Sequence, residues 1–392
     1  MQEIFILSGA RTPMGRLLGT LSSFSATDLG GIAIREAVKR AGISPSDVNE
    51  VIMGCVLQAG LGQGPARIAA IKGGIPVNVP SFTVNKVCGS ALKAIILGVQ
   101  AIKLGDADVI VAGGMESMTN APHMSFLRTG TKFGDIKLID HMIYDGLWCS
   151  FNNQHMGELA EYTAEKAGIT REMQDEFAYN SHMKAVKATN EGKFKDEIVK
   201  IEVKTKEGVN IIDKDEGPRP DTSLEKLAKL PPVFKKDGTV TAGNAPGIFD
   251  GASAVVIASE KFIKERNLKP FARIIAYGSN FVEPKDLFFA PIGAIKKVTE
   301  KTGLKHPNDF DLIEINEAFS AQVLADVKEL EIDMNKLNVN GGAVALGHPI
   351  GASGARIVVT LMYALKNKGL KKGLASLCLG GGGAVGISIE VL

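Results

Sequence analysis

One pattern of strands around a buried helix occurs twice in this chain of 392 residues, and it limits the possible folds more than any other feature. The first copy has apolar strand-like runs on either side of an almost wholly apolar helical segment, at residues 3–8, 50–56, 91–104 and 108–112. The second copy repeats this order at residues 271–277, 311–315, 351–366 and 374–379. Strand, helix, strand predicts a right-handed crossover in a mostly parallel sheet, so we expect two α/β halves of one design.

The last strand of each copy shows where the chain is interrupted. In the second copy the closing run at residues 383–390 follows its neighbour directly, whereas the matching run at 251–258 lies far from Gly114. We therefore expect an inserted domain between the strands of the first half. The expected domains are residues 1–117 plus 247–268 for the N-terminal half, 118–246 for the insertion and 269–392 for the C-terminal half. Insertions near the carboxyl ends of strands often bind substrate, although a helical decoration remote from the site is the plainer alternative.

Composition excludes several classes of protein. The 45 basic and 43 acidic residues give a net charge of +2, which does not predict nucleic-acid binding. No uninterrupted apolar run reaches about 18 residues, so we expect no membrane span, and no signal peptide is visible. The cysteines are far apart and form no C-x-x-C pair, which argues against disulfides and zinc and favours a reducing cytoplasm. They are Cys55, Cys88, Cys149 and Cys378.

Cys88 is the first candidate for chemistry because it lies where a short extended run meets the buried helix. The amide groups and dipole at a helix N-terminus favour a thiolate, so we expect a lowered thiol pKa. Gly89 and Ser90 are small and would let a substrate carbonyl approach the backbone. The alternative is a buried structural cysteine, which is the commonest fate of this residue.

Three segments of the second half strengthen the catalytic interpretation. Asn316 directly follows a predicted strand and could orient a water or an oxyanion, or simply cap a helix. His348 lies between glycine and proline before a helix, where it could act as a base or a donor rather than as an ordinary loop histidine. Cys378 ends a strand, and Gly380 follows in a run of glycines whose amides could bind an anion. Together these residues predict a site for acyl transfer and carbon-acid chemistry.

The glycine-rich segments do not predict a bound nucleotide cofactor. They lack the Lys-Ser/Thr pair of a phosphate loop and the acidic residue expected after a dinucleotide fingerprint. No set of metal-ligating residues is apparent either. We therefore expect no metal and no cofactor other than the substrate itself.

Four blocks in this order resemble the thiolase family, and within it the acetyl-CoA acetyltransferases. They are Asn85–Ser90, Asn316–Phe319, Gly347–Gly351 and Cys378–Gly382, and the resemblance covers essentially the whole chain. It implies a thiolase fold, an α/β protein with duplicated βαβαβαββ halves in five αβαβα layers and an inserted loop domain. It also implies acyl-CoA thioester substrates and a homo-oligomer, either a dimer or a tetramer.

The resemblance also implies roles for the candidate residues. Cys88 takes the acyl group while His348 accepts its proton, and Cys378 removes an α-proton from a second acetyl-CoA. His348 and a water held by Asn316 bind the enolate oxygen. The backbone N–H groups of Cys88 and Gly380 bind the acyl-enzyme oxygen, and the kinetics should be ping-pong.

Residues implied to bind substrate lie mainly in the insertion and beside the catalytic blocks. Met156, after His155, resembles the residue that narrows the acyl pocket in the short-chain biosynthetic branch, and Arg219 matches one that meets the nucleotide end of coenzyme A. The full set is His155, Met156, Arg219, Ala242, Leu287 and Phe319. Several positions depart from the family pattern, namely Ala91, Pro246, Leu287, Phe288 and Ala290. These departures leave the acyl chain length and the affinity for coenzyme A open.

The predicted function is therefore reversible condensation of two acetyl-CoA to acetoacetyl-CoA through an acetyl-Cys88 intermediate. One alternative is a 3-ketoacyl-CoA thiolase of broader range working degradatively, which the altered 287–290 segment leaves open. Another is a non-catalytic acyl-CoA-binding relative, which would lack a catalytic residue. The direction of flux in the cell is not encoded in these residues.

Overall fold

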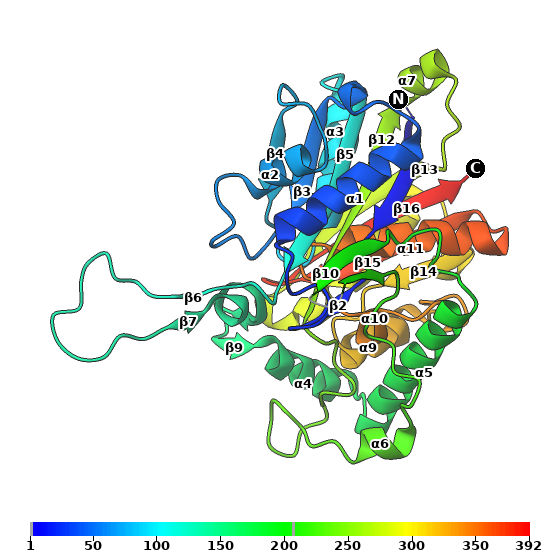
Figure 1. Ribbon diagram of the computed structural model, residues 1–392. Coiled ribbons are helices and arrows are strands. Elements are labelled where there is room, and N and C mark those ends of the chain that lie inside the picture. The colour runs from blue at the N-terminus through cyan, green and yellow to red at the C-terminus, as the bar shows by residue number, and fades with distance from the viewer. Residues whose placement is uncertain (1–2, 206–207) are drawn as a thin grey trace.

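A computed structural model describes residues 3–205 and 208–392, and its centre is one large mixed sheet (Figure 1). In the described residues the strands run in the order β14-β15-β16-β13-β1-β12-β5-β3-β4, with β2 paired to β12. Their bounds are β1 Ile4–Arg11, β2 Gly15–Arg16, β3 Glu50–Gly54, β4 Ser81–Val84, β5 Val109–Ser117, β12 Phe249–Ser259, β13 Ala272–Phe281, β14 Leu312–Ile315, β15 Lys372–Leu379 and β16 Gly383–Val391.

The strand pairing confirms the duplication. The order β1-β12-β5-β3 in one half matches β13-β16-β15-β14 in the other, with the same antiparallel, antiparallel and parallel pairings. Each half even has a register shift at the same place, between Ile6 and Ser8 in β1 and between Ile274 and Ala276 in β13. The two half-sheets are joined because β1 pairs antiparallel with β13, with Ile4 opposite Ile274.

The expectation of a mostly parallel sheet is wrong. β12 and β16 run antiparallel to both of their neighbours in the sheet, and only the pairs at the two outer ends are parallel. In the second half the cause is local, because the short turn between β15 and β16 reverses the chain. Strand-helix-strand spacing predicts the crossover pairs correctly but gives no direction for the strand that closes each half.

Helices complete five layers. The helices of the two halves are α1 Ala26–Ala41, α2 Pro65–Lys72, α3 Ser90–Leu104, α7 Glu260–Arg266, α8 Ala290–Lys301, α9 Ser320–Leu330, α10 Ala343–Leu346 and α11 Ser353–Lys368, with 3₁₀ turns at Pro45–Asp47, Pro284–Phe289 and Pro307–Asp309. α3 and α11 share one core with the inner faces of both half-sheets. α1 and α2 cover the outer face of the first half, and α8 and α9 that of the second.

The central position of α3 explains its composition. The segment Val87–Leu104 is long and apolar enough to cross a membrane by length and composition alone. Here α3 lies between the two half-sheets, so Ile95, Ile96 and Val99 are buried against them. The strands also bury both faces: Ile110 packs inward while Val109 and Val111 pack against the outer helices. This double burial accounts for strand sequences that are apolar without alternation.

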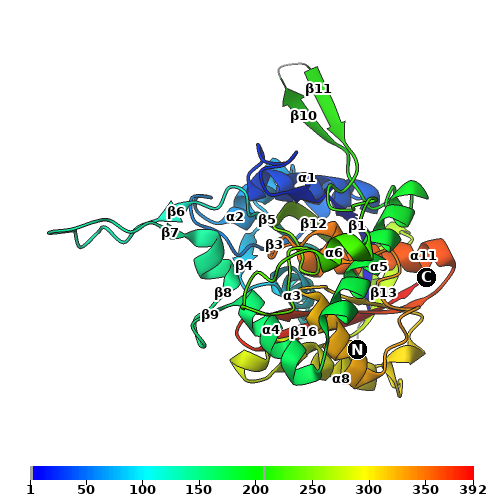
Figure 2. The ribbon, with the colours of Figure 1, turned by 90° about the horizontal axis from the view of Figure 1, so that it is seen from below.

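The segment between β5 and β12 consists of helices and short strands that lie outside the large sheet. Its elements are β6 His123–Met124, β7 Ile139–Asp140, a π-helical turn at Met142–Leu147, β8 Trp148–Cys149, β9 Gln154–His155, α4 Met156–Ala167, α5 Arg171–Asn190, β10 Ile201–Thr205, β11 Gly208–Ile212 and α6 Leu224–Ala228. α4 and α5 pack against α9, whereas the β6–β7 arm and the β10–β11 hairpin extend away from the body (Figures 1 and 2).

Candidate active site

Cys88 lies in a strained turn between β4 and α3. Val87 has a positive φ of 49°, which is unfavourable for a β-branched residue and marks a turn held by its surroundings. Asn85 Oδ1 accepts from the Val87 N–H, and Ser90 Oγ accepts from the Lys86 N–H and donates to the Val87 carbonyl. Two of the polar residues in this block therefore fix the backbone that presents the thiol.

A glycine follows Cys88 because there is no room for a side chain. A Cβ at Gly89 would lie 2.5 Å from Leu379 Cδ2, a residue at the end of β15. The turn that carries Cys88 is thus packed directly on the strand end that carries Cys378. Contact between the two halves at this point, and not the local sequence alone, sets the position of the nucleophile.

His348 is held on an equally constrained backbone. Gly347 has a φ of 97°, and a Cβ there would lie 2.1 Å from the ring of Phe249, so glycine is required. His348 Nδ1 lies 2.6 Å from Ser353 Oγ, which itself donates to the Pro349 carbonyl at 2.9 Å. Because the single hydroxyl proton is used on Pro349, Ser353 accepts from Nδ1–H. That tautomer leaves the Nε2 lone pair of His348 free to act as a base.

The imidazole is neutral in this setting. Burial, with a smaller contribution from the positive charge of Arg356, lowers the pKa of His348 to about 3. Asn316, the residue after β14, is fully buried and places its Nδ2 3.4 Å from His348 Nδ1. A neutral base with an amide at its side is therefore available at neutral pH.

The expected lowering of the Cys88 pKa is wrong. Burial raises the pKa of Cys88 to about 12, although the N–H groups of Cys88 and Gly380 act in the opposite direction. Burial likewise raises the pKa of Cys378 well above its usual value, with Cys88 and Asp326 adding to the rise. These two N–H groups do donate to the Cys88 sulfur, but the loss of water around the thiolate outweighs them. Both groups are thiols in the free protein, so each needs a proton acceptor during reaction.

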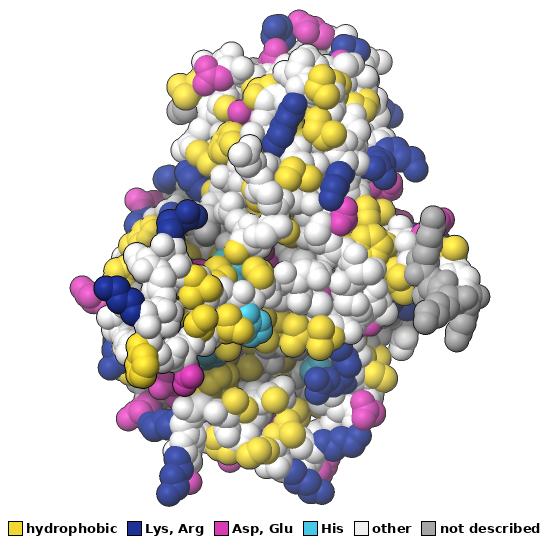
Figure 3. All heavy atoms as spheres, turned by 60° about the vertical axis from the view of Figure 1, so that its left-hand side comes forward, with side chains coloured by type: hydrophobic (Ala, Val, Ile, Leu, Met, Phe, Trp, Pro, Cys, Tyr) yellow, Lys and Arg dark blue, Asp and Glu magenta, His cyan; other side chains and the backbone are white. Residues whose placement is uncertain are grey.

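Most of the candidate residues line one apolar cavity of ≈300 Å³. The structure brings together Cys88, His155, Met156, Leu287, Phe319, His348, Cys378 and Gly380. Figure 3 shows this face as a hollow lined by hydrophobic side chains, with a histidine visible among them. Asn316 does not line the cavity but lies behind His348.

The other two candidates, Arg219 and Ala242, line a second and more polar cavity of ≈240 Å³. The two cavities adjoin, because both are lined by Ala245, Gly247 and Ile248. Side chains of the expected insertion line both of them, so its interpretation as a decoration remote from the site is wrong. A substrate with an apolar reactive end and a charged far end fits this pair of cavities.

His155 and Met156 enter the apolar cavity at the start of α4. His155 caps this helix through Nδ1, which accepts from the Gly157 N–H, and its ring stacks on Phe234 at a centroid distance of 4.9 Å. A Cβ at Gly157 would lie 2.3 Å from the Phe234 ring, so glycine is needed to seat that ring. Phe234 in turn meets Phe319 edge-on at 6.3 Å, which closes one wall of the cavity.

Three side chains that contact the site residues or the loop that carries them were not predicted from the sequence. Ser353 holds His348, Arg356 approaches Asn316, and Glu317 fixes the glycine loop before His348 by accepting from the Val344 N–H. Ser353 lies one turn beyond His348 at a helix start, which is a signal that could have identified it. The contacts of Arg356 and Glu317 join segments that are distant in the sequence, so no local sequence pattern predicts them. Residues 3–205 and 208–392 contain no group of three His, Cys, Asp or Glu residues that could hold a metal ion.

Comparison with known proteins agrees with this geometry. The family model for the thiolase N-terminal domain matches residues 4–261, and that for the thiolase C-terminal domain matches residues 268–391. The chain belongs to the thiolase family. This thiolase is 49% identical over 391 residues to an acetyl-CoA acetyltransferase of Allochromatium vinosum, covering 99% of each chain. It is 50% identical over 392 residues to one of Cupriavidus necator, covering 100% of each.

A solved structure supports the fold of this thiolase as well. The crystal structure of the Bacillus anthracis acetyl-CoA acetyltransferase matches with a TM-score of 0.97 at 44% identity, covering 100% of this chain and 99% of that one. Such a match confirms the thiolase fold along the whole length, including the five layers described above.

Proposed function

We propose that this thiolase is an acetyl-CoA C-acetyltransferase that catalyses the reversible condensation of two acetyl-CoA to acetoacetyl-CoA and CoA. The observation that carries the proposal is the convergence of Cys88, His348 and Cys378, from both halves, on one apolar cavity. The names of the relatives, which are acetyl-CoA acetyltransferases over their full length, support the same activity.

In the first half-reaction Cys88 is the nucleophile. Its sulfur forms a bond to the carbonyl carbon of acetyl-CoA, and the bond from that carbon to the CoA sulfur breaks. Because the thiol pKa is high, proton transfer to His348 Nε2 must accompany the attack, and this proton then goes to the departing CoA thiolate. The N–H groups of Cys88 and Gly380, which face the sulfur, are donors for the developing oxyanion.

In the second half-reaction Cys378 is the base that takes a proton from the α-carbon of acetyl-CoA. It first gives its thiol proton to His348 Nε2, and the resulting thiolate removes an α-proton from a second acetyl-CoA. The Nε2–H of His348, with a water held by Asn316, then donates to the enolate oxygen. The enolate carbon attacks acetyl-Cys88, the bond from the acetyl carbon to the Cys88 sulfur breaks, and the proton on His348 passes to that sulfur. Cys378 keeps the α-proton, so both thiols and the neutral imidazole are restored, and acetoacetyl-CoA leaves.

The wall of the cavity supports a short acyl group. Leu287 and Phe288 are buried and line it together with Met156 and Phe319, and the Phe288 and Phe319 rings meet edge-on at 5.4 Å. Side chains packed in this way have little freedom to open for a longer chain. The broader-range alternative is tested by comparing kcat/KM for acetoacetyl-CoA and 3-ketohexanoyl-CoA, and a preference for the longer substrate would replace the proposed function by that alternative.

The second cavity is suited to the nucleotide end of coenzyme A. Arg16, Arg219 and His182 line it, and the two arginines offer positive charge to phosphate groups. Burial, together with Arg219 and Arg16, lowers the pKa of His182 to about 4, so His182 is neutral there. Pro246, in the wall of the apolar cavity, has neither a hydroxyl nor an N–H to offer the pantetheine.

The remaining expectations belong to the same proposal. The enzyme acts in a reducing cytoplasm as a homo-oligomer, a dimer or tetramer, in acyl-CoA and fatty acid metabolism. It needs no cofactor or metal beyond its CoA thioester substrates and has no nucleic-acid or membrane partner. Free thiols at Cys88 and Cys378 are consistent with this setting.

Mass spectrometry of the protein after exposure to acetyl-CoA tests the proposal directly. We expect one acetyl adduct, on Cys88, and none in the Cys88→Ser variant. Cys149 is a matched internal control, since it is a buried free cysteine outside the proposed chemistry. A well-folded protein without an adduct on Cys88 would rule out the mechanism and favour a non-catalytic acyl-CoA-binding role.

A further inference from the structure

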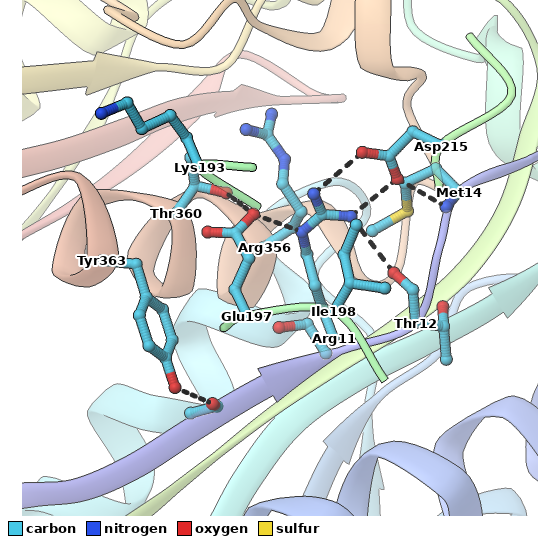
Figure 4. Close-up of polar contacts among 12 residues, drawn as sticks. Arg11, Thr12, Met14, Lys193, Glu197, Ile198, Asp215, Arg356, Thr360 and Tyr363 are labelled. Atoms are coloured by element: carbon cyan, nitrogen blue, oxygen red, sulfur yellow. Dashed lines mark hydrogen bonds and ion pairs between the residues drawn. The ribbon is translucent and has the colours of Figure 1, made fainter. Parts of the chain in front are cut away.

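Arg356 is a fully buried arginine with no part in the chemistry described above. It lies on α11, has an exposed fraction of 1%, and reaches Asn316 from the side away from the cavity. Its Nη2 donates to Asn316 Oδ1 at 3.4 Å. Figure 4 shows Arg356 beside Glu197 and Arg11, in a polar layer between the inserted segment and α11.

The chemistry of the guanidinium decides how the Asn316 amide is oriented. An amide group can present either its oxygen or its NH₂ to a neighbour, whereas a guanidinium can only donate. Oδ1 of Asn316 must therefore face Arg356, and Nδ2 lies on the His348 side, 3.4 Å from Nδ1. Because Nδ1–H already donates to Ser353, the Asn316 NH₂ group does not bond to it and is left to donate to a water. If Arg356 were replaced by a group that also accepts, either orientation of the amide would be possible.

A purely structural ion pair does not explain Arg356. Arg11 shows what such a pair looks like here, since its guanidinium binds Asp215 through two contacts of 2.7 and 2.9 Å. Arg356 Nη1, in contrast, lies 3.7 Å from Glu314 Oε2, and among the described residues neither atom has a hydrogen-bond partner. The hydrogen bond from Nη2 to Asn316 Oδ1, at 3.4 Å, is shorter than this contact with Glu314.

Three acidic residues near Arg356 act on its buried positive charge, while its Nη2 bonds to Asn316. Glu314, Glu317 and Glu197 all act electrostatically on Arg356. Glu197 Oε1 accepts from Arg11 Nε at 2.6 Å and from Thr360 Oγ1 at 3.2 Å (Figure 4), whereas its Oε2 has no hydrogen-bond partner among the described residues. The three acids thus act on the charge of Arg356 through space, while its Nη2 is directed at Asn316.

We propose that Arg356 is a positioning residue that orients the amide of Asn316, and so the NH₂ group that serves the enolate half of the reaction. This proposal rests on the proposed function. It predicts a division between the two half-reactions: acylation of Cys88 does not use the Asn316 amide, whereas condensation does.

The test replaces Arg356 in a background that also removes the carboxylate of its ion-pair neighbour, Glu314. Arg356→Gln is made together with Glu314→Gln, and Glu314→Gln alone is the matched control. Glutamine can accept as well as donate, so it no longer dictates the amide orientation. We expect condensation kcat to fall roughly 10–100-fold relative to the control, while KM and the rate of acetyl-Cys88 formation stay within about threefold.

A double-mutant cycle shows whether the effect passes through Asn316. In an Asn316→Ala background the same Arg356 substitution should have little further effect on condensation. Arg356→Met in the Glu314→Gln background is the second variant if the first does not fold, and it should show the same division. Equal losses in both half-reactions, an unchanged condensation rate, or additive losses with Asn316→Ala would each overturn the positioning role.

The controls separate this proposal from the proposed function. If the unaltered protein forms no acetyl adduct on Cys88, the proposed function fails, whatever Arg356 does. If the unaltered protein forms the adduct and condenses, and the Arg356 variants condense equally fast, only the positioning role fails.

Discussion

The two halves share one architecture but use the ends of their strands differently. The pairing register makes Met115 of β5 the counterpart of Cys378 in β15, because Met115 lies opposite Ala252 and Cys378 opposite Ala384 at matching positions of the closing strands. Extending the register by one residue makes Gly54 the counterpart of Asn316. The second half thus has a thiol and an amide where the first has an apolar side chain and a glycine.

This difference shows that the two similar halves contribute different parts of one site. At Gly54 a Cβ would lie 2.6 Å from the Ala91 nitrogen, so the first half brings α3 tightly against its strand and places Cys88 just before that helix. In the second half the matching position holds Asn316, which contacts His348 and Arg356 instead. One half holds the nucleophile through close packing, and the other supplies the polar groups that act on it.

The largest effect should come from removing the thiol of the second half. Cys378→Ala should still form acetyl-Cys88, but condensation should fall on the order of 10³-fold or more, because no group remains to take the α-proton. Met115→Leu is the matched control at the equivalent position of the first half, and it should keep kcat within about threefold. Stopped-flow assays of condensation and mass spectrometry of the adduct measure the two steps. Unimpaired condensation in Cys378→Ala would remove the carbon-acid role from this residue.

A smaller effect should distinguish Asn316 from its counterpart Gly54. Asn316→Ala should lower condensation on the order of 10²-fold, as expected for loss of one group that stabilises an oxyanion. Gly54→Ala should instead lower the free energy of unfolding by about 1–3 kcal/mol, because its Cβ meets the backbone of α3. Denaturant unfolding and condensation assays of both variants check this. A catalytic loss without a stability loss in Gly54→Ala would contradict the assignment of close packing to the first half.

The smallest effect is a gradual dependence on pH. The thiol of Cys88, whose pKa is about 12, should react with iodoacetamide about tenfold faster for each pH unit between 7 and 9. The sign follows from the raised pKa: the reactive thiolate is the minor form below it and grows as pH rises. Alkylation rates at several pH values, with the Cys88 adduct identified by mass spectrometry, measure this. A plateau near neutral pH would show that the helix N-terminus outweighs burial after all.

Much of the site could be predicted because its residues lie in short constrained turns. Cys88 before an apolar helix, His348 between glycine and proline, and Cys378 before a run of glycines are each visible within a few residues. Strand ends at one edge of a sheet then bring such turns together. The contact of Arg356 with Asn316 joins residues 40 positions apart, so no local sequence pattern predicts it.

The sequence by itself determined the duplicated order of strands and helices, the residues that carry the chemistry, and the glycines that their turns require. These features follow from hydrophobic patterning and backbone geometry, which act over a few residues. Only the tertiary structure decided the antiparallel direction of the closing strands, the division of the substrate-binding residues between two cavities, and the raised pKa of Cys88. These depend on which distant segments exclude water and pair with one another, and burial therefore overrode the local effect of the helix N-terminus.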